Sequence, residues 1–571
     1  MVITIADTQY PSVSTLIENK VASRIHAKDA TLYDFSAEAQ QYAQDFMGWV
    51  DLATNTPYPV SSIVEFAQRA VASGIRSILL IGEGGSTQAP MTITKFNKED
   101  SSLIKFRVLD SDSPVRVRSI MTDLNPESML VLVSSKSGTT IETRLMLQAV
   151  RKEMQRKMAP EKIPSHLVAI TDPGTELEQL ALEESWLGVF SGVPSVGGRY
   201  SALSVFGLVP TALVGIDMDD YMAHAVEAEQ ACSVDTVENP AIQLAAFLYD
   251  NYVAGRDKFS FLAPKRGRVL GLWIEQLVAE SLGKEGKGIL PNIEIDPLVL
   301  TRDTGDRTAI MYKTKTDLWD ERKNFEMSYA YMSKDIPCLE FSIESAPELA
   351  EHFVMWEYAI AMCGYLMKVC PFDQPDVAAA KHEVLEILKE GHNEPDFVQE
   401  TIGSMYMGTV EVRLGDELKG ARTLEVALHA LLASIKPGDY FALNVFLPFT
   451  GEGRREALET IRHSVAAECG VASCLEIGPR YLHSTGQLQK GGPNNGVFLI
   501  VSANEMLDIE LDNAEAPSLA ALAKAQAEGD LKVLNERGRR CMHVHLPDNS
   551  SVVLRQLGEV VQRICRNLPR C

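Results

Sequence analysis

Short strand-forming segments alternate with helical segments between residues 60 and 230. Four of them, at residues 77–81, 106–110, 129–133 and 167–171, end in polar or glycine-containing turns. Buried strands that alternate with helices are typical of parallel sheets. The pattern predicts an α/β fold with a doubly wound parallel sheet, in which ligands bind beyond the carboxyl ends of the strands.

The same organisation continues through the rest of the chain. A strand at 259–263 follows a polar crossing at 231–240, and further strands are expected at 440–446 and 496–501. A chain of 571 residues has room for about three or four domains of ordinary size. We expect an N-terminal helical segment at 1–50, a first α/β domain at 51–230, a second at 231–400 and a third C-terminal α/β unit at 401–571.

The bulk composition excludes several classes of partner. The formal net charge of −23 disfavours binding to nucleic acid or to anionic membranes. We expect neither a transmembrane helix, since no window of about 18 apolar residues occurs, nor a signal peptide. Nine cysteines without a CxxC pair indicate neither a disulfide framework nor a zinc site. These features predict a cytoplasmic protein.

The turn after the segment 129–133 concentrates groups that bind anions. Four hydroxyls, one lysine and one glycine occur within the six residues from Ser135 to Thr140, and an amphipathic helix follows at 145–154. A helix N-terminus presents unpaired N–H groups and the positive end of the helix dipole. The pattern predicts a phosphate site, with a helix cap that binds no ligand as the alternative.

Two further glycine-rich turns follow predicted strands. Gly82-Glu83-Gly84-Gly85-Ser86 would let a ligand approach bare backbone. Gly197 and Gly198 precede Arg199, whose guanidinium stays charged and can hold a phosphate or stabilise an enediolate. A surface arginine in a turn is the alternative for Arg199.

A predicted helix carries a candidate acid–base pair of residues. Gln276 and Glu280 are four residues apart, so that they share one helical face. Glu280 ends an apolar run just before a glycine turn, where a partly desolvated carboxylate can act as a base. The alternative is a glutamate at the end of a helix that pairs with Lys284.

These motifs resemble those of the glucose-6-phosphate isomerases, a family of the sugar-isomerase (SIS) superfamily. The sequence at 135–143 is similar to the family's phosphate loop, and Gly-Gly-Arg-Tyr-Ser at 197–201 matches its motif without change. Gln-x3-Glu-Ser-x-Gly-Lys at 276–284 and Phe-Asp-Gln-Pro-x-Val-x3-Lys at 372–381 resemble its base and sugar-binding motifs. The likeness covers about residues 20–571 and is greatest to the isomerase half of bacterial transaldolase/phosphoglucose isomerase fusions.

The resemblance implies two SIS-type α/β sandwich domains and a set of site residues. It assigns the proton shuttle between C2 and C1 to Glu280, stabilisation of the enediolate to Arg199, and opening of the sugar ring to Lys381 with a histidine. The implied substrate-binding residues are Gly85, Ser86, Ser135, Lys136, Ser137, Thr140, Glu142, Gly198, Gln276 and Gln374.

The position of the histidine departs from that in the short isomerases. There a Leu-His-Ser-x-Gly-Gln stretch precedes the Phe-Asp-Gln-Pro motif, whereas here it follows at 482–487, and residues 300–337 contain no histidine. The fusion-type isomerases share this order. We therefore assign ring opening to His483, with His352 as the second candidate. Glu83 and Leu282 also depart from the family's residues.

The resemblance implies reversible conversion of glucose 6-phosphate to fructose 6-phosphate through a cis-enediol, as in glycolysis and gluconeogenesis, without a metal or redox cofactor. Because His483 lies on the same chain, a monomer is conceivable beside a homodimer. Two alternatives stay open: a non-catalytic SIS-type sugar-phosphate sensor, and an isomerase that also takes mannose 6-phosphate. The presence of Glu280, Arg199 and Lys381 favours an enzyme.

Overall fold

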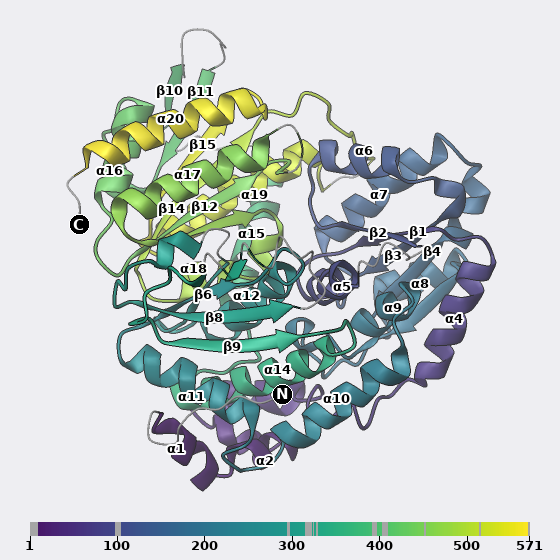
Figure 1. Cartoon of the computed structure of the whole chain (residues 1–571). Helices are drawn as coiled ribbons and strands as arrows, with labels where there is room; N and C mark the ends of the chain where they lie inside the picture. The colour runs from purple at the N-terminus through teal and green to yellow at the C-terminus, as the bar shows by residue number, and fades with distance from the viewer. Residues whose placement is uncertain are drawn as a thin grey trace. The chain divides into compact units, whose positions relative to one another are not determined.

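The chain divides into two compact units. The computed structural model describes residues 10–97, 104–293, 297–314, 323, 325–326, 329–390, 397–401, 409–449, 451, 453–512 and 515–568. Unit 1 comprises the chain up to Asp110 together with Asp123–Leu147 and Arg151–Asp373, and unit 2 comprises Ser111–Thr122, Gln148–Val150 and the chain from Gln374 onward (Figure 1). The four-part division proposed from the sequence stays a prediction.

Unit 1 contains a parallel five-stranded sheet in the order β2-β1-β3-β4-β5. Every residue of β1, β3 and β4 is buried, whereas β2 is exposed at its start and β5 is only partly buried. The sequence pattern predicted all of these strands except β5. The strands are β1 (Ser77–Ile81), β2 (Lys105–Leu109), β3 (Met129–Ser134), β4 (Leu167–Thr171) and β5 (Gly188–Ser191). The helices along this part are α4 (Val60–Ala72), α5 (Gly85–Phe96), α7 (Ile141–Gln155), α8 (Glu176–Glu183) and α9 (Val205–Leu213).

A second sheet of unit 1 has four parallel strands in the order β7-β6-β8-β9. They are β6 (Lys258–Leu262), β7 (Leu290–Ile293), β8 (Arg307–Thr314) and β9 (Cys338–Ile343). Its helices are α10 (Met218–Cys232), α11 (Pro240–Val253), α12 (Arg268–Leu282) and α14 (Leu349–Met367), preceded in the chain by α1 (Ser12–Glu18), α2 (Val21–His26) and α3 (Ala37–Phe46). The expected α/β class with doubly wound parallel sheets is confirmed.

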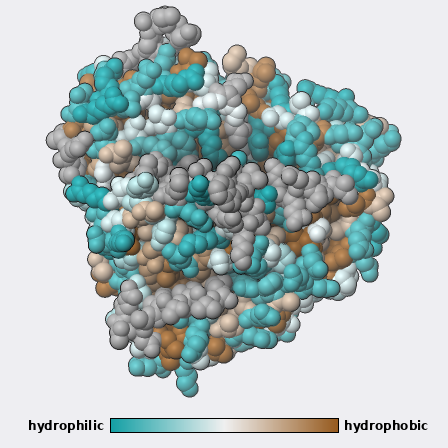
Figure 2. Space-filling model, in the orientation of Figure 1, coloured by the Kyte–Doolittle hydropathy of each residue, from teal (hydrophilic) through white to brown (hydrophobic). Residues whose placement is uncertain are grey.

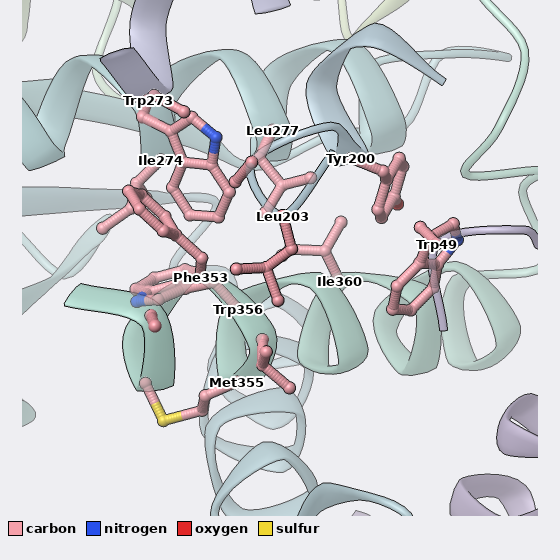
Figure 3. Close-up of a cluster of buried hydrophobic side chains, with 14 of the residues drawn as sticks. Trp49, Tyr200, Leu203, Trp273, Ile274, Leu277, Phe353, Met355, Trp356 and Ile360 are labelled. Atoms are coloured by element: carbon pink, nitrogen blue, oxygen red, sulfur yellow. The ribbon is translucent and has the colours of Figure 1, made fainter. Parts of the chain in front are cut away.

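Aromatic side chains fill the core of unit 1 around α12 and α14 (Figure 3). Trp273 of α12 meets Phe353 of α14 edge to face, with ring centroids 4.7 Å apart. Trp49 stacks on Tyr200 with centroids 4.9 Å apart. Buried aromatic pairs of this kind contribute about 0.5–1.5 kcal/mol each beyond the area they bury. They fix α12, the helix that carries the candidate base.

Unit 2 contains a mixed six-stranded sheet in the order β10-β11-β15-β14-β12-β13. β12 to β15 run parallel, while β10 and β11 pair in antiparallel fashion at one edge. The strands are β10 (Phe397–Thr401), β11 (Thr409–Leu414), β12 (Tyr440–Phe446), β13 (Ala472–Ile477), β14 (Gly496–Ala503) and β15 (Arg540–Leu546). The helices are α6 (Pro114–Asp123), α15 (Pro375–Glu390), α16 (Leu424–Ala433), α17 (Arg454–Cys469), α18 (Gly486–Gly491), α19 (Leu519–Glu536) and α20 (Ser551–Asn567).

The two faces of the unit 2 sheet differ in polarity. One face is apolar and forms a core with α16, α17 and α20. The other face carries buried polar groups, among them Asn444 of β12, which donates to Asp530 of α19 at 3.4 Å. This buried polar layer lies next to the segment that contains His483.

Figure 2 shows hydrophilic residues over most of the face in view, with hydrophobic residues distributed between them. Among the described residues, no helix combines the length and the apolar character that are needed to cross a membrane.

Candidate active site

The predicted phosphate loop joins β3 to α7. Thr140 is the N-cap of α7, yet its hydroxyl does not cap the helix and lies 3.0 Å from the hydroxyl of Ser135. Ser135 is buried, and its N–H donates to the carbonyl of Ile170 at 3.0 Å. Two hydroxyls are therefore placed at the N-terminus of α7, where the helix dipole favours an anion.

The conformation of this loop depends on Gly138. Its φ of +68° lies in the left-handed region, and a Cβ there would come within 2.7 Å of the Cβ of Thr175. Ser137 is exposed, and its Oγ accepts hydrogen bonds from the N–H and the hydroxyl of Thr139 at 3.3 and 3.0 Å. Glu142 is buried in the first turn of α7.

Lys136 is bound on the outer side of the loop. Its ammonium group pairs with Asp172 and donates to the carbonyls of Pro194 and Val193 at 3.0 and 3.4 Å. Desolvation raises the pKa of Asp172, and the Lys136 ammonium opposes that rise. Lys136 thus ties the loop to the segment after β4 and β5, which is a positioning contact rather than a direct hold on a ligand.

The two glycine-rich turns meet through their backbones. Gly84, the N-cap of α5, has a φ of +54°. A Cβ on Gly85 would lie 2.0 Å from the carbonyl oxygen of Gly198, so only glycine fits there. Ser86 follows in the first turn of α5 and is buried. The turn at 82–86 is therefore packed directly against the residue that precedes Arg199.

Arg199 is almost fully buried, with 3% of its surface exposed. Its Nε donates to the hydroxyl of Ser281 at 2.8 Å, and its Nη2 donates to the carbonyls of Pro371 and Asp373 at 2.7 and 2.9 Å. Its Nη1 lies 3.1 Å from Oε1 of Glu280. The planar guanidinium, with five donors in a fixed geometry, suits this arrangement better than an ammonium would.

The next residue, Tyr200, anchors this turn in the core. Besides stacking on Trp49 (Figure 3), its ring lies 5.6 Å from that of Phe372, and its hydroxyl lies 3.3 Å from that of Ser281. The position of Arg199 is thus set by packing on one side and by hydrogen bonds on the other.

The predicted pair on α12 lies as expected on one face of the helix. Nε2 of Gln276 donates to Oε2 of Glu280 at 3.1 Å, while Oε1 of Glu280 pairs with Arg199. The side chain of Glu280 is buried apart from about a tenth of its surface. Lys284 binds Asp373 instead. The alternative interpretation, in which Glu280 pairs with Lys284, is therefore wrong.

Lys284 organises the segment before the Phe-Asp-Gln-Pro motif. It is buried, and its ammonium group donates to the carbonyls of Cys370 and Asp373 at 2.5 Å each and pairs with the carboxylate of Asp373. Burial, together with the nearby charge of Arg199, lowers its pKa to about 8, although Asp373 opposes the shift. Lys284 belongs to the motif at 276–284, but no local pattern in that motif indicates this role.

Lys284 makes the stability of the protein depend on pH. Because its pKa falls from 10.5 to about 8 on folding, the unfolded chain binds more protons between these values, and stability rises with pH in that window. We expect the free energy of unfolding of the natural protein, relative to Lys284→Met, to rise by up to about 1.4 kcal/mol per pH unit from pH 8 to 10. Urea denaturation of both proteins measures this. The difference in unfolding free energy between the two proteins should be constant from pH 6 to 7. A decrease of this difference above pH 8 would contradict the lowered pKa of Lys284.

The remaining predicted residues belong to unit 2. Gln374 is exposed and lies one residue before α15 begins, rather than inside the helix. Lys381 lies within α15, and its side chain is outside the part that the structure describes. His483 is half-buried at the end of a short 3-10 helix, Arg480–His483.

His352, the second candidate for ring opening, lies in the hydrophobic core of unit 1. It is 1% exposed, its Nδ1 is 3.1 Å from the hydroxyl of Tyr312, and its ring packs against Phe341. Burial lowers its pKa to about 3. A neutral imidazole enclosed by aromatic rings is a core residue, and this correction leaves His483 as the remaining candidate.

Comparison with known proteins places this geometry in context. The family model described as Phosphoglucose isomerase matches residues 65–291. Glucose-6-phosphate isomerase of Rippkaea orientalis is 28% identical over 406 residues, covering 63% of this chain and 76% of the relative. That of Mycoplasmopsis pulmonis is 27% identical over 393 residues, covering 61% and 91%.

Solved structures share the fold. A glucose-6-phosphate isomerase from Chlamydia trachomatis superposes with a TM-score of 0.56 at 16% identity, covering 69% of this chain and 88% of that one. A hypothetical protein from Thermus thermophilus gives a TM-score of 0.57 at 22% identity, covering 68% and 100%. The family match spans the two glycine turns, the phosphate loop and the helix with Gln276 and Glu280. Over this part of its length the chain is similar to the phosphoglucose isomerases.

Proposed function

We propose that this chain interconverts glucose 6-phosphate and fructose 6-phosphate, the activity for which its curated relatives are named. The observation that carries the proposal is the buried group formed by Gln276, Glu280 and Arg199. A carboxylate held between an amide and a guanidinium is what a proton shuttle next to a developing negative charge requires.

In this proposal the phosphate group binds at the N-terminus of α7. The hydroxyls of Ser135 and Thr140 lie there together, and the turn at 82–86, with Ser86, adds backbone and a further hydroxyl. These neutral donors and the helix dipole hold an anion within a chain whose net charge is −23.

The isomerisation then needs one base. The Glu280 carboxylate takes the proton from C2 of the open-chain aldose, the C–H electrons form the C1–C2 double bond, and the carbonyl oxygen at C1 gains the negative charge. Arg199 stabilises that charge. Glu280 returns the proton to C1 after the hydroxyl proton moves from O2 to O1, and the ketone forms at C2. A single carboxylate therefore serves both directions.

Ring opening comes before this step and is assigned to unit 2. Lys381 and His483 would move the proton between O1 and the ring oxygen, with Gln374 on the phosphate, as the family resemblance implies. Unit 1 therefore carries the residues assigned to isomerisation, and unit 2 carries those assigned to ring opening.

We also propose that the enzyme works in the cytoplasm as a homodimer or a monomer. Each of the eight cysteines that the structure describes is a free thiol, which agrees with a reducing compartment. If His483 of the same chain completes the site, a monomer is competent. Sedimentation of the active enzyme tests this, since activity confined to a dimer peak would contradict it.

The direct test of the activity starts from fructose 6-phosphate. We expect the purified protein to form glucose 6-phosphate, read through a coupled dehydrogenase, at more than about one turnover per second. Mannose 6-phosphate, offered in a parallel assay, tests for broader specificity. Protection of the protein from thermal unfolding by either sugar phosphate, without turnover, would instead indicate a sensor.

The contact between the two glycine turns yields a further prediction. Gly85→Ala would place a methyl group 2.0 Å from the carbonyl oxygen of Gly198, and one turn must move. Because a misplacement of about 1 Å at a site can cost about a hundredfold, we expect kcat/KM to fall at least about tenfold. Gly197→Ala is the matched control, since its Cβ meets nothing closer than 3.8 Å. Equal activity of both variants would contradict the role of the contact.

A further inference from the structure

Within unit 2, one buried glutamine joins the start of α15 to the segment that contains His483. The side chain of Gln487 is fully buried and makes two hydrogen bonds to Asp376. Its Oε1 accepts from the backbone N–H of Asp376 at 3.0 Å, and its Nε2 donates to Oδ2 of Asp376 at 2.7 Å. Both the backbone and the side chain of Asp376 are thereby held by one residue.

A further contact holds the side chain of Asp376 in place. Its Oδ1 pairs at 2.5 Å with Arg537, the C-cap residue of α19, and only 6% of Asp376 is exposed. Asp376 is the second residue of α15, where a carboxylate also interacts favourably with the helix dipole. Gln374 lies two residues before it, and Lys381 lies five residues after it in the same helix.

The segment that carries Gln487 is itself fixed to α19 and to the sheet of unit 2. Near its start, the hydroxyl of Tyr481 donates to Asp530 at 2.6 Å, and near its end Lys490 pairs with Asp530 at 2.6 Å. Between these points Thr485 donates to Glu476 of β13 at 2.9 Å. Residues 481–490, with His483 among them, thus form a braced segment rather than a free loop.

We propose that Gln487 and Asp376 are positioning residues. They hold the segment that carries Gln374 and Lys381 in a fixed position relative to His483. The inference rests on the proposed function, because it concerns the ring-opening residues of that reaction. Neither residue need touch the substrate. The two hydrogen bonds from Gln487 fix both the backbone and the side chain of Asp376. Residues 481–490 are themselves held by several contacts and provide a rigid support for these bonds.

The test variants exchange the amide and the carboxylate of Gln487 and Asp376. Gln487→Glu sets a second carboxylate against Oδ2 of Asp376, so that the two negative charges repel and the contact opens. Adding Asp376→Asn supplies an amide that donates to the new carboxylate, while its oxygen still faces Arg537, so the double variant restores the contact with reversed polarity. Glu383→Gln is the matched control, since it removes a solvent-accessible pair between α15 and Lys532 of α19.

The measurement isolates ring opening from isomerisation. In full-length protein that also carries Glu280→Gln, proton transfer at C2 is blocked, and exchange between the two anomers of [1-13C]glucose 6-phosphate, followed by magnetisation transfer, reports ring opening alone. Calorimetric titration with 6-phosphogluconate, an acyclic sugar-acid phosphate, counts the sites that still bind. The exchange rate is expressed per binding site, so loss of folded protein does not mimic the effect.

We expect Gln487→Glu to lower the exchange rate per site at least about tenfold. The double variant Gln487→Glu with Asp376→Asn should recover a rate within about threefold of that of the protein with natural residues at both positions. Glu383→Gln should leave the rate unchanged. An unchanged rate per site in Gln487→Glu, or a loss that the double variant does not repair, would overturn the inference. The inference would also be overturned if the natural protein isomerised its substrate but the Glu280→Gln variant catalysed no anomer exchange. If the natural protein does not isomerise at all, the proposed function fails instead.

Discussion

Glu280→Gln is expected to lower kcat by at least about a hundredfold while the protein stays folded. General acid–base catalysis by one side chain contributes about 10²–10⁴-fold, and glutamine keeps the shape of the side chain without a site that binds the proton. The amide oxygen can still accept from Arg199, so the contact now seen at 3.1 Å need not be lost. Steady-state rates in both directions, with thermal unfolding in parallel, measure the effect.

The control for this variant is Glu285→Gln. It makes the same chemical change five residues further on, at an exposed position. We expect its kcat to stay within about twofold of that of the natural protein, since surface substitutions are usually close to neutral. Near-normal turnover in Glu280→Gln would refute its assignment as the base, whatever the control shows.

Arg199→Met is expected to reduce both activity and stability. Removing one partner from a buried ion pair typically costs about 3–5 kcal/mol, because the other charge is left uncompensated. Here Glu280 would lose its partner, and the carbonyls of Pro371 and Asp373 would lose their donors. The same change removes the charge that is proposed to stabilise the enediolate, so kcat/KM should fall by at least about a hundredfold.

Arg256→Met is the control that separates loss of stability from loss of activity. Arg256 is also in unit 1 and makes a paired contact with Asp303, at 2.8 and 2.7 Å, but it plays no part in the proposed site. We expect a smaller loss of stability and unchanged kcat/KM. Urea denaturation and initial rates on both variants provide the comparison. If Arg199→Met lost stability but kept its activity, the arginine would be a structural residue only.

Local sequence patterns were sufficient for much of the fold. The bounds of β1, β4 and β12 agree with the segments expected from the sequence, because continuous apolar runs are local signals. β5 is a short strand of partly exposed residues, and such a strand carries little periodic signal. The antiparallel pairing of β11 with β15 depends on partners that are distant in sequence.

The contacts of the site were less predictable than its members. The motif around Glu280 indicated a carboxylate next to Gln276, but the pairing of Lys284 with Asp373, 89 residues away, has no local signature. The bond from Gln487 to Asp376 spans 111 residues. For His352 the apolar sequence around it was a signal, since a histidine in a long buried helix is more often a core residue than a catalyst.

The approach of Gly85 to Gly198 involves main-chain atoms on both sides. A contact of this kind has no rotamers, so no side-chain movement can relieve it, and neither turn can move closer to the other. A shift of the turn at 82–86 toward Gly198 would therefore push the backbone that leads into Arg199. In the proposed reaction, a phosphate group that moved the turn in this direction would move the guanidinium of Arg199 as well.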